Sequence, residues 1–176
     1  MKRCFLLTPA CNMRYPQEII FLEFMAQIQS TQPVFCHLQG LGLDNALTQA
    51  NAILQNLKLE PHNSIYWTNP QYLLSQNEGL ILPFILGAVI NTINYQQIIV
   101  LGQLQYNEII NNSLILPALQ HLLTLPLAKN SCLLLPLSAI NQQNQAIISN
   151  IKQQGVAVYG IHTLKQALTL CTQDIM

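Results

Sequence analysis

Short apolar runs alternate with helical segments in the second half of the chain, and this alternation limits the possible folds more than any other feature. The apolar runs end at glycine or proline, as buried strands often do, and lie at 97–101, 132–135 and 156–159. The helices predicted after them are 114–127, 141–154 and a last helix capped by Thr163. Strands that alternate with helices in this way pair in parallel, so a parallel sheet is expected here.

The first half of the chain is richer in consecutive strands. Strands are predicted at 2–8, 18–29, 33–38 and 64–68, and a helix at 44–58, where Asp44 is the N-cap or first-turn acid. We therefore expect one mixed α/β (α+β) domain over 1–176. Its strand-rich half covers about 1–70 and its βα half about 71–176.

The composition narrows the classes of function. Hydrophobic residues make up 51% of the chain and charged residues only 8%, with seven basic and seven acidic residues that cancel. Because phosphate neutralisation drives nucleic-acid binding, the lack of a basic excess argues against direct contact with nucleic acid. Such a small charge also causes little mutual repulsion, which favours self-association or a protein partner.

The most apolar segment is too short to cross a membrane. It runs over 79–93, about fifteen residues, whereas a spanning helix needs about twenty. We expect a buried helix there and no membrane contact. The apolar run at the N-terminus is also shorter than a signal peptide requires, and Pro9 interrupts it, so a strand and a cytoplasmic location are predicted.

The five cysteines show no metal-binding or redox spacing. No Cys-x-x-Cys pair occurs, so neither a zinc site nor a thioredoxin-like motif is expected. No cofactor is predicted. Free and mostly buried thiols are the prediction. Cys36 and His37 are neighbours on a predicted strand, where side chains point to opposite faces, which argues against a catalytic pair.

Several motifs in the second half resemble the Lon-protease-like domain. The end of that domain has a strand that closes in Val/Ile-Pro, then a helix, then a strand like Gly-Ile-Glu-Val-Tyr-Gly and a Thr/Ser-Leu-x-x-Ala/Val-Leu helix. This chain has a similar order: the strand is Leu133–Pro136, a helix follows, and the last strand and helix lie in Gly155–Leu168. Upstream, Gly102–Leu104 is similar to the family's Gly-Glu-Leu/Ile turn. Leu116–Leu119 is similar to its Val-Leu-Pro-Ala-Ala helix. The resemblance implies a Lon-protease-domain-like fold.

Within this superfamily, the chain most resembles the N-terminal domain of the ComM family, also called YifB or magnesium-chelatase-subunit-like. Leu38–Leu43 is similar to that family's Gly-Leu-Pro turn, and Leu80–Ile85 to its Phe-Asp-Leu-Pro-Ile-Ala helix start. Relatives of this kind are oligomeric DNA-remodelling ATPases of the AAA+ class. The resemblance therefore implies a context of DNA uptake (bacterial competence) or recombination, with an AAA+ ATPase as the expected partner.

The chain departs from Lon-type proteases where they carry their catalytic Ser and Lys. The Ser belongs at the start of the helix corresponding to 80–92, where this chain has Ile81, and the helix corresponding to 114–127 has no lysine before Lys129. ComM-type domains also lack this dyad. No G-x-x-x-x-G-K-[ST] loop for ATP occurs in the chain. The prediction is a non-catalytic interaction or regulatory module. The alternatives are a diverged hydrolase with a rebuilt site and a remnant of a longer ComM-like ATPase.

Three residues are candidates for a binding surface, and no catalytic, cofactor or metal residue is predicted. Trp67, beside Tyr66, offers a ring for stacking; Gln103 stands in place of the family's Glu. His121 could approach the region that corresponds to the dyad, although a hydrogen-bonded helix histidine is the simpler interpretation. Ser113 is expected to cap the following helix.

Overall fold

The computed structural model describes residues 3–11, 18–28, 43–68, 78–91 and 94–172. The predicted strand at 33–38, with Cys36 and His37, lies outside the described residues. The Leu38–Leu43 motif lies outside them as well, apart from Leu43 itself.

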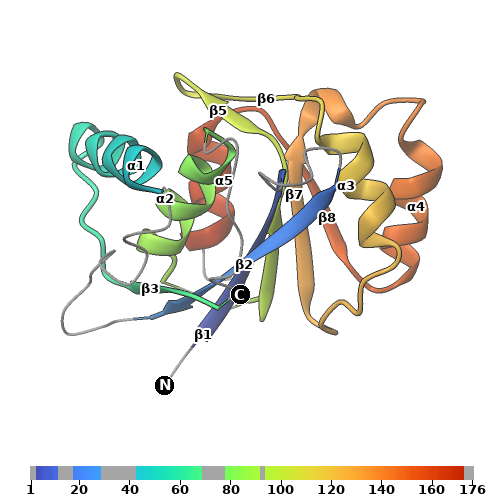
Figure 1. The fold of residues 1–176 in the computed structure, drawn as a ribbon, viewed down its shortest axis with the longest axis horizontal. Helices are drawn as coiled ribbons and strands as arrows, with labels where there is room; N and C mark the ends of the chain where they lie inside the picture. Colours follow the sequence, from blue (N-terminus) through green and yellow to red (C-terminus); the bar gives the residue numbers. More distant parts are fainter. Residues whose placement is uncertain (1–2, 12–17, 29–42, 69–77, 92–93, 173–176) are drawn as a thin grey trace.

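A six-stranded mixed sheet forms the centre of the molecule, with strand order β3-β2-β1-β4-β7-β8 (Figure 1). The strands are β1 (Arg3–Cys11), β2 (Ile19–Gln27), β3 (Ser64–Trp67), β4 (Gln97–Val100), β7 (Ser131–Pro136) and β8 (Ala157–Ile161). β2 pairs antiparallel with β1 and β3, whereas β1, β4, β7 and β8 are mutually parallel. The mixed α/β class and the parallel pairing of the second half are therefore confirmed.

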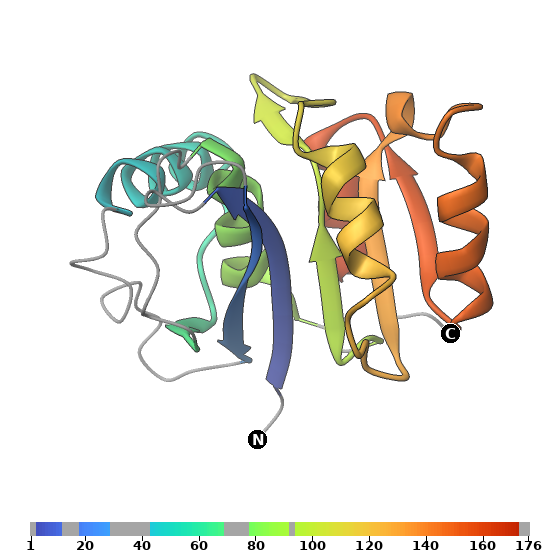
Figure 2. The same ribbon diagram turned by 45° about the vertical axis from the view of Figure 1, so that its right-hand side comes forward.

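Helices cover both faces of this sheet. They are α1 (Asp44–Asn56), α2 (Ile81–Val89), α3 (Ile115–Leu122), α4 (Gln145–Gln153) and α5 (Leu164–Thr172). Side chains alternate across a strand, so Leu6 of β1 belongs to the core that contains α1, α2 and α5, and Leu7 to the core beneath α3 and α4. Figure 2 shows α3 and α4 together on one side of the sheet.

α2 is the central helix of the larger core. Each of its nine residues is buried, so a buried helix within 79–93 is confirmed, although it covers only 81–89. Phe84 meets Phe24 of β2 edge to face, with ring centroids 5.1 Å apart. The buried amide of Asn63 donates to the carbonyls of Gly87 (2.9 Å) and Ile90 (2.6 Å), where a helix end leaves its carbonyls unpaired. Among the described residues, no helix is long and apolar enough to cross a membrane.

The last helix begins with a capping box. The backbone N–H of Gln166 donates to the Thr163 hydroxyl at 3.2 Å. In return, the Gln166 side-chain oxygen accepts from the backbone of His162 (2.7 Å) and of Thr163 (3.1 Å). The Thr-x-x-Gln spacing satisfies the free N–H groups of the helix start, and the predicted Thr163 cap is confirmed.

The helices predicted at 114–127 and 141–154 are also too long. α3 ends at Leu122 rather than 127, because Pro126 cannot continue a helix and disfavours helical backbone in the residue before it. α4 begins at Gln145 rather than 141, because the Asn141 side chain accepts from the Asn144 backbone at 3.0 Å and holds a turn. Ala146, expected to face inward, is exposed, and Ile148 is buried instead.

β8 continues through Gly160, where the strand was expected to stop. Gly160 faces Leu137 and Ile140, and a Cβ at this position would lie 2.6 Å from the Ile140 Cδ1. The missing side chain lets the turn after β7 pack directly on the strand. The glycine therefore marks a close approach and not a strand end.

A small hairpin formed by β5 (Gln103–Gln105) and β6 (Glu108–Ile110) is absent from the predicted elements. It is attached to the start of α5, because Ile109 N–H donates to the His162 carbonyl at 2.8 Å and Leu164 N–H to the Asn107 carbonyl at 2.9 Å. Tyr106 occupies its tip with a φ of 56° and is 89% exposed. A strand of three residues is too short for a period of two to be visible in the sequence.

Comparing Gly102 with Gly155 distinguishes the cost of backbone strain from the cost of steric overlap. Both have left-handed backbone, with φ of 104° at Gly102 and 87° at Gly155, but only at Gly102 would a Cβ strike another group, at 2.6 Å from the Pro136 ring. We expect Gly155→Ala to lower the free energy of unfolding by about 1 kcal/mol, from strain alone. Gly102→Ala should cost about 1–3 kcal/mol more, because a proline ring cannot rotate away.

Urea denaturation of both variants measures this difference. Equal losses for the two variants would show that the turn at Gly102 relaxes freely, and would contradict the tight packing of Gly102 on Pro136.

Candidate functional site

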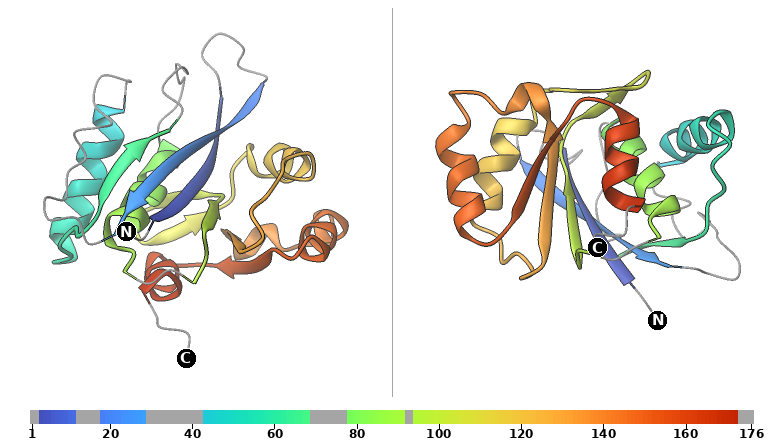
Figure 3. Two further views of the ribbon diagram at one scale, coloured as in Figure 1. Left: turned by 90° about the horizontal axis from the view of Figure 1, so that it is seen from below. Right: turned by 180° about the vertical axis from the view of Figure 1, so that it is seen from behind.

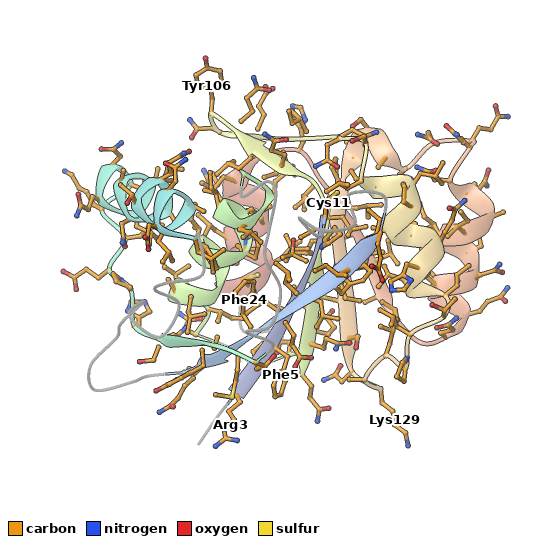
Figure 4. All side chains as sticks on the ribbon, in the orientation of Figure 1. Arg3, Phe5, Cys11, Phe24, Tyr106 and Lys129 are labelled. Carbon is orange, nitrogen blue, oxygen red and sulfur yellow. The ribbon has the colours of Figure 1, made fainter. Side chains whose placement is uncertain are left out.

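A small polar pocket lies where the carboxyl ends of β1 and β4 meet. Cys11 is the last residue of β1, and Gln103 comes three residues after β4 ends. Because the two strands are parallel, both residues reach the same edge of the sheet. Figure 4 shows Cys11 at this end of β1. The pocket has a volume of about 140 Å³.

Two helices begin at this pocket. Gly79 and Leu80 line it just before α2, and Asn112, Ser113 and Leu114 line it just before α3. The Asn112 side-chain oxygen accepts from the Leu114 backbone at 3.0 Å, so Asn112 satisfies an N–H group of the α3 start. The residue at the N-cap position of α3 is Leu114, not Ser113. The predicted Ser113 cap is therefore wrong, and its neighbour has that role.

The polar side chains that line the described part of the pocket are the half-buried Cys11 thiol, the Gln103 and Asn112 amides and the Ser113 hydroxyl. Among the residues that the structure describes, none with a charged side chain or an imidazole lines the pocket. The described part of the chain also contains no group of three His, Cys, Asp or Glu placed to hold a metal ion. The pocket can thus offer hydrogen bonds, and the described lining has no base to activate a nucleophile.

The structure does not bring the three predicted binding residues together. Gln103 lines the pocket. His121 lies in the last turn of α3, away from the end that borders the pocket, and stacks on Phe21 of β2 with ring centroids 5.7 Å apart and planes within 7°. Trp67 ends β3 and pairs with Phe24, and its side chain lies outside the described part. His121 is therefore a packing residue of the sheet face.

Sequence reasoning missed Cys11 and Asn112 as pocket residues. The first strand was predicted to end at Thr8, whereas β1 continues through Pro9 to Cys11 opposite β2. Pro9 suggested a strand end because it lacks an N–H group. Polar residues that follow parallel strands converge at one edge of the sheet, and this rule could have indicated the pocket.

The other described cysteines are core residues, as predicted. Cys4, Cys132 and Cys171 are free and buried, whereas Cys11 is half-buried. Burial raises the pKa of the Cys4 and Cys171 thiols to about 12, and it raises that of Cys132 further. A thiol that stays protonated is a poor nucleophile.

No protein-family model matches this chain, and a comparison with curated proteins finds no significant match.

We expect Cys11 to react with iodoacetamide at pH 8 much faster than Cys4, Cys132 and Cys171. The latter are buried and protonated at this pH, whereas Cys11 opens into the pocket. The measurement is peptide mass spectrometry of the folded Cys36→Ser protein over time, with a urea-unfolded sample as the control. Equal rates for all four thiols in the folded protein would contradict the described core.

The buried thiols also make the fold sensitive to alkali. An unfolded thiol ionises near pH 9, whereas the folded Cys4 and Cys171 stay protonated up to about pH 12. Their contribution to stability is complete below pH 9 and is lost as the pH rises from 9 toward 12, by roughly 1 kcal/mol per thiol per pH unit.

Urea denaturation between pH 8 and 10.5 tests this slope. Cys171→Ala should flatten the dependence, whereas Ala167→Gly, a buried change in the same helix that removes no titrating group, should leave it unchanged. The same slope for all three proteins would show that other groups cause the effect.

Proposed function

We propose that the chain is a non-catalytic Lon-protease-like domain, similar to the N-terminal domain of ComM-type proteins, and that it works as a protein-interaction module. The proposal rests on one observation: at one end of the sheet, a pocket without charged side chains in its described lining lies near exposed apolar residues. The described pocket there has no charged side chain. Close by, three apolar side chains face solvent beyond the carboxyl ends of the parallel strands: Tyr106 (89% exposed), Leu137 (56%) and Ile140 (45%).

The position of the pocket supports the first part of this proposal. In Lon-type proteases the Ser and Lys belong to the helices that correspond to α2 and α3, and here the starts of both helices border one pocket. Ile81 is buried in α2, and the polar groups of the described lining are a thiol, a hydroxyl and two amides. The pocket thus has the place of a catalytic site and lacks a base in its described lining.

The exposed apolar residues support the second part. Tyrosine is enriched where proteins bind one another, since its ring gives a large contact area at a small entropic cost. The strained backbone of Tyr106 holds this ring away from the rest of the hairpin, as Figure 4 shows. With equal numbers of acidic and basic residues, the surface suits a protein partner better than a nucleic acid. An AAA+ ATPase of DNA uptake or recombination is the partner that the resemblance implies.

A pull-down of the tagged full chain from host lysate, read by mass spectrometry, tests the interaction role. We expect an AAA+ ATPase to be recovered, and Tyr106→Asp to reduce its recovery about tenfold, because the charge opposes burial of the ring at the interface. Lys129→Asp is the matched control, since Lys129 is exposed just before β7, at the opposite end of the molecule from Tyr106 (Figure 4).

Two results would contradict the proposal. One is equal recovery of the ATPase by Tyr106→Asp and the wild-type chain. The other is hydrolysis of a casein or ester substrate by the purified chain that Cys11→Ser abolishes, which would favour the diverged hydrolase.

A further inference from the structure

β8 forms one edge of the sheet. It is the last strand in the order of the sheet, and within the described residues no strand pairs with its outer side. Its five residues, Ala157–Ile161, include neither a charge nor a proline, the two features that commonly block pairing at a sheet edge. Among the described residues, 157–161 form no backbone hydrogen bond outside the sheet ladder, so the outer groups of β8 can pair with another strand.

A mostly apolar groove of about 410 Å³ runs beside this edge. Tyr159 and Ile161 of β8 form one wall, and Lys165, Thr169 and Leu170 of α5 form the other. The right-hand view of Figure 3 shows the chain leaving β8 and turning into α5, which lies in front of the sheet. An edge strand beside a helix is the arrangement with which several domains bind an extended peptide by strand addition.

Charge indicates what kind of segment fits this groove. Lys165 is the one charged side chain among the described residues that line it. Lys165 also lines a second apolar groove, of about 470 Å³, on the other side of the α5 start, and no described acidic residue lines either groove. Lys165 lies in the first turn of α5, where the helix dipole adds to its positive charge. The complementary ligand is apolar and carries a carboxylate.

We propose that the edge of β8 and the groove beside α5 bind an extended, mostly apolar segment of a partner protein, which joins the sheet next to β8 and places a carboxylate near Lys165. This inference deepens the interaction role proposed above and rests on it. A second copy of the chain fits less well, because β8 has no carboxylate to offer and pairing would add a second Lys165 to the interface.

Selection from a phage library of random decapeptides, with the purified full chain as bait, tests the proposal. We expect the enriched peptides to combine β-branched residues with at least one Asp or Glu. In the complex with the best synthetic peptide, the amides of 157–161 should exchange hydrogen more slowly, because strand addition pairs them. Lys165→Glu should weaken its binding about fivefold or more, since attraction becomes repulsion.

Lys152→Glu is the matched control. Lys152 is exposed on α4, on the other side of the sheet, so the same change of charge should alter affinity less than about twofold. No enrichment, an equal effect of both variants, or slowed exchange outside 157–161 would overturn the proposal. If the peptide-free protein has the mass of a dimer and its amides at 157–161 already exchange slowly, the edge binds a second copy of the chain.

The lysate pull-down separates the two proposals. An AAA+ ATPase that binds wild-type and Lys165→Glu chains equally would leave the interaction role in place and remove β8 from it. Loss of binding by Tyr106→Asp alone would locate the interface at the hairpin.

Discussion

The burial of α2 is the constraint on which the rest of the structure depends. All nine residues of this helix are buried, so it can exist only where other elements enclose it. Phe84 packs on Phe24 of β2, Gly87 lets the helix approach Ile65 of β3, and Asn63 satisfies the carbonyls at its end. On the same face α1 and α5 complete the enclosure. The helix therefore joins the antiparallel strands of the first half to the βα units of the second.

This packing also determines where polar groups gather. The segment before α2 reaches the sheet at the carboxyl ends of β1 and β4, and the segment before α3 arrives at the same place. The pocket formed there contains Cys11, whereas the other described cysteines lie in the core, where burial raises the thiol pKa. The same fold leaves β8 at the edge of the sheet, beside α5. The pocket and the β8 edge therefore both result from strand order.

Much of the fold could be predicted from the sequence, because buried strands and amphipathic helices have distinct periods. The errors occur where a local signal has two meanings. Gly160 suggested a strand end and instead makes room for Ile140, and Pro9 suggested the end of β1 and lies within it. The candidate site was less predictable. Gln103 lines the pocket, but His121 packs on Phe21, since a histidine on a helix carries no signal of which side chain it will meet.

The sequence by itself determined the class of fold, the parallel strands of the second half, the buried central helix and the capping of α5 by Thr163. These follow from hydrophobic periods and from short-range hydrogen bonds, which depend on residues a few positions apart. Only the tertiary structure decided that Cys11 and Gln103 share a pocket, that the β5–β6 hairpin attaches to the start of α5, and that β8 is an open edge beside Lys165. Those arrangements depend on strand order and long-range contact, which no local pattern encodes.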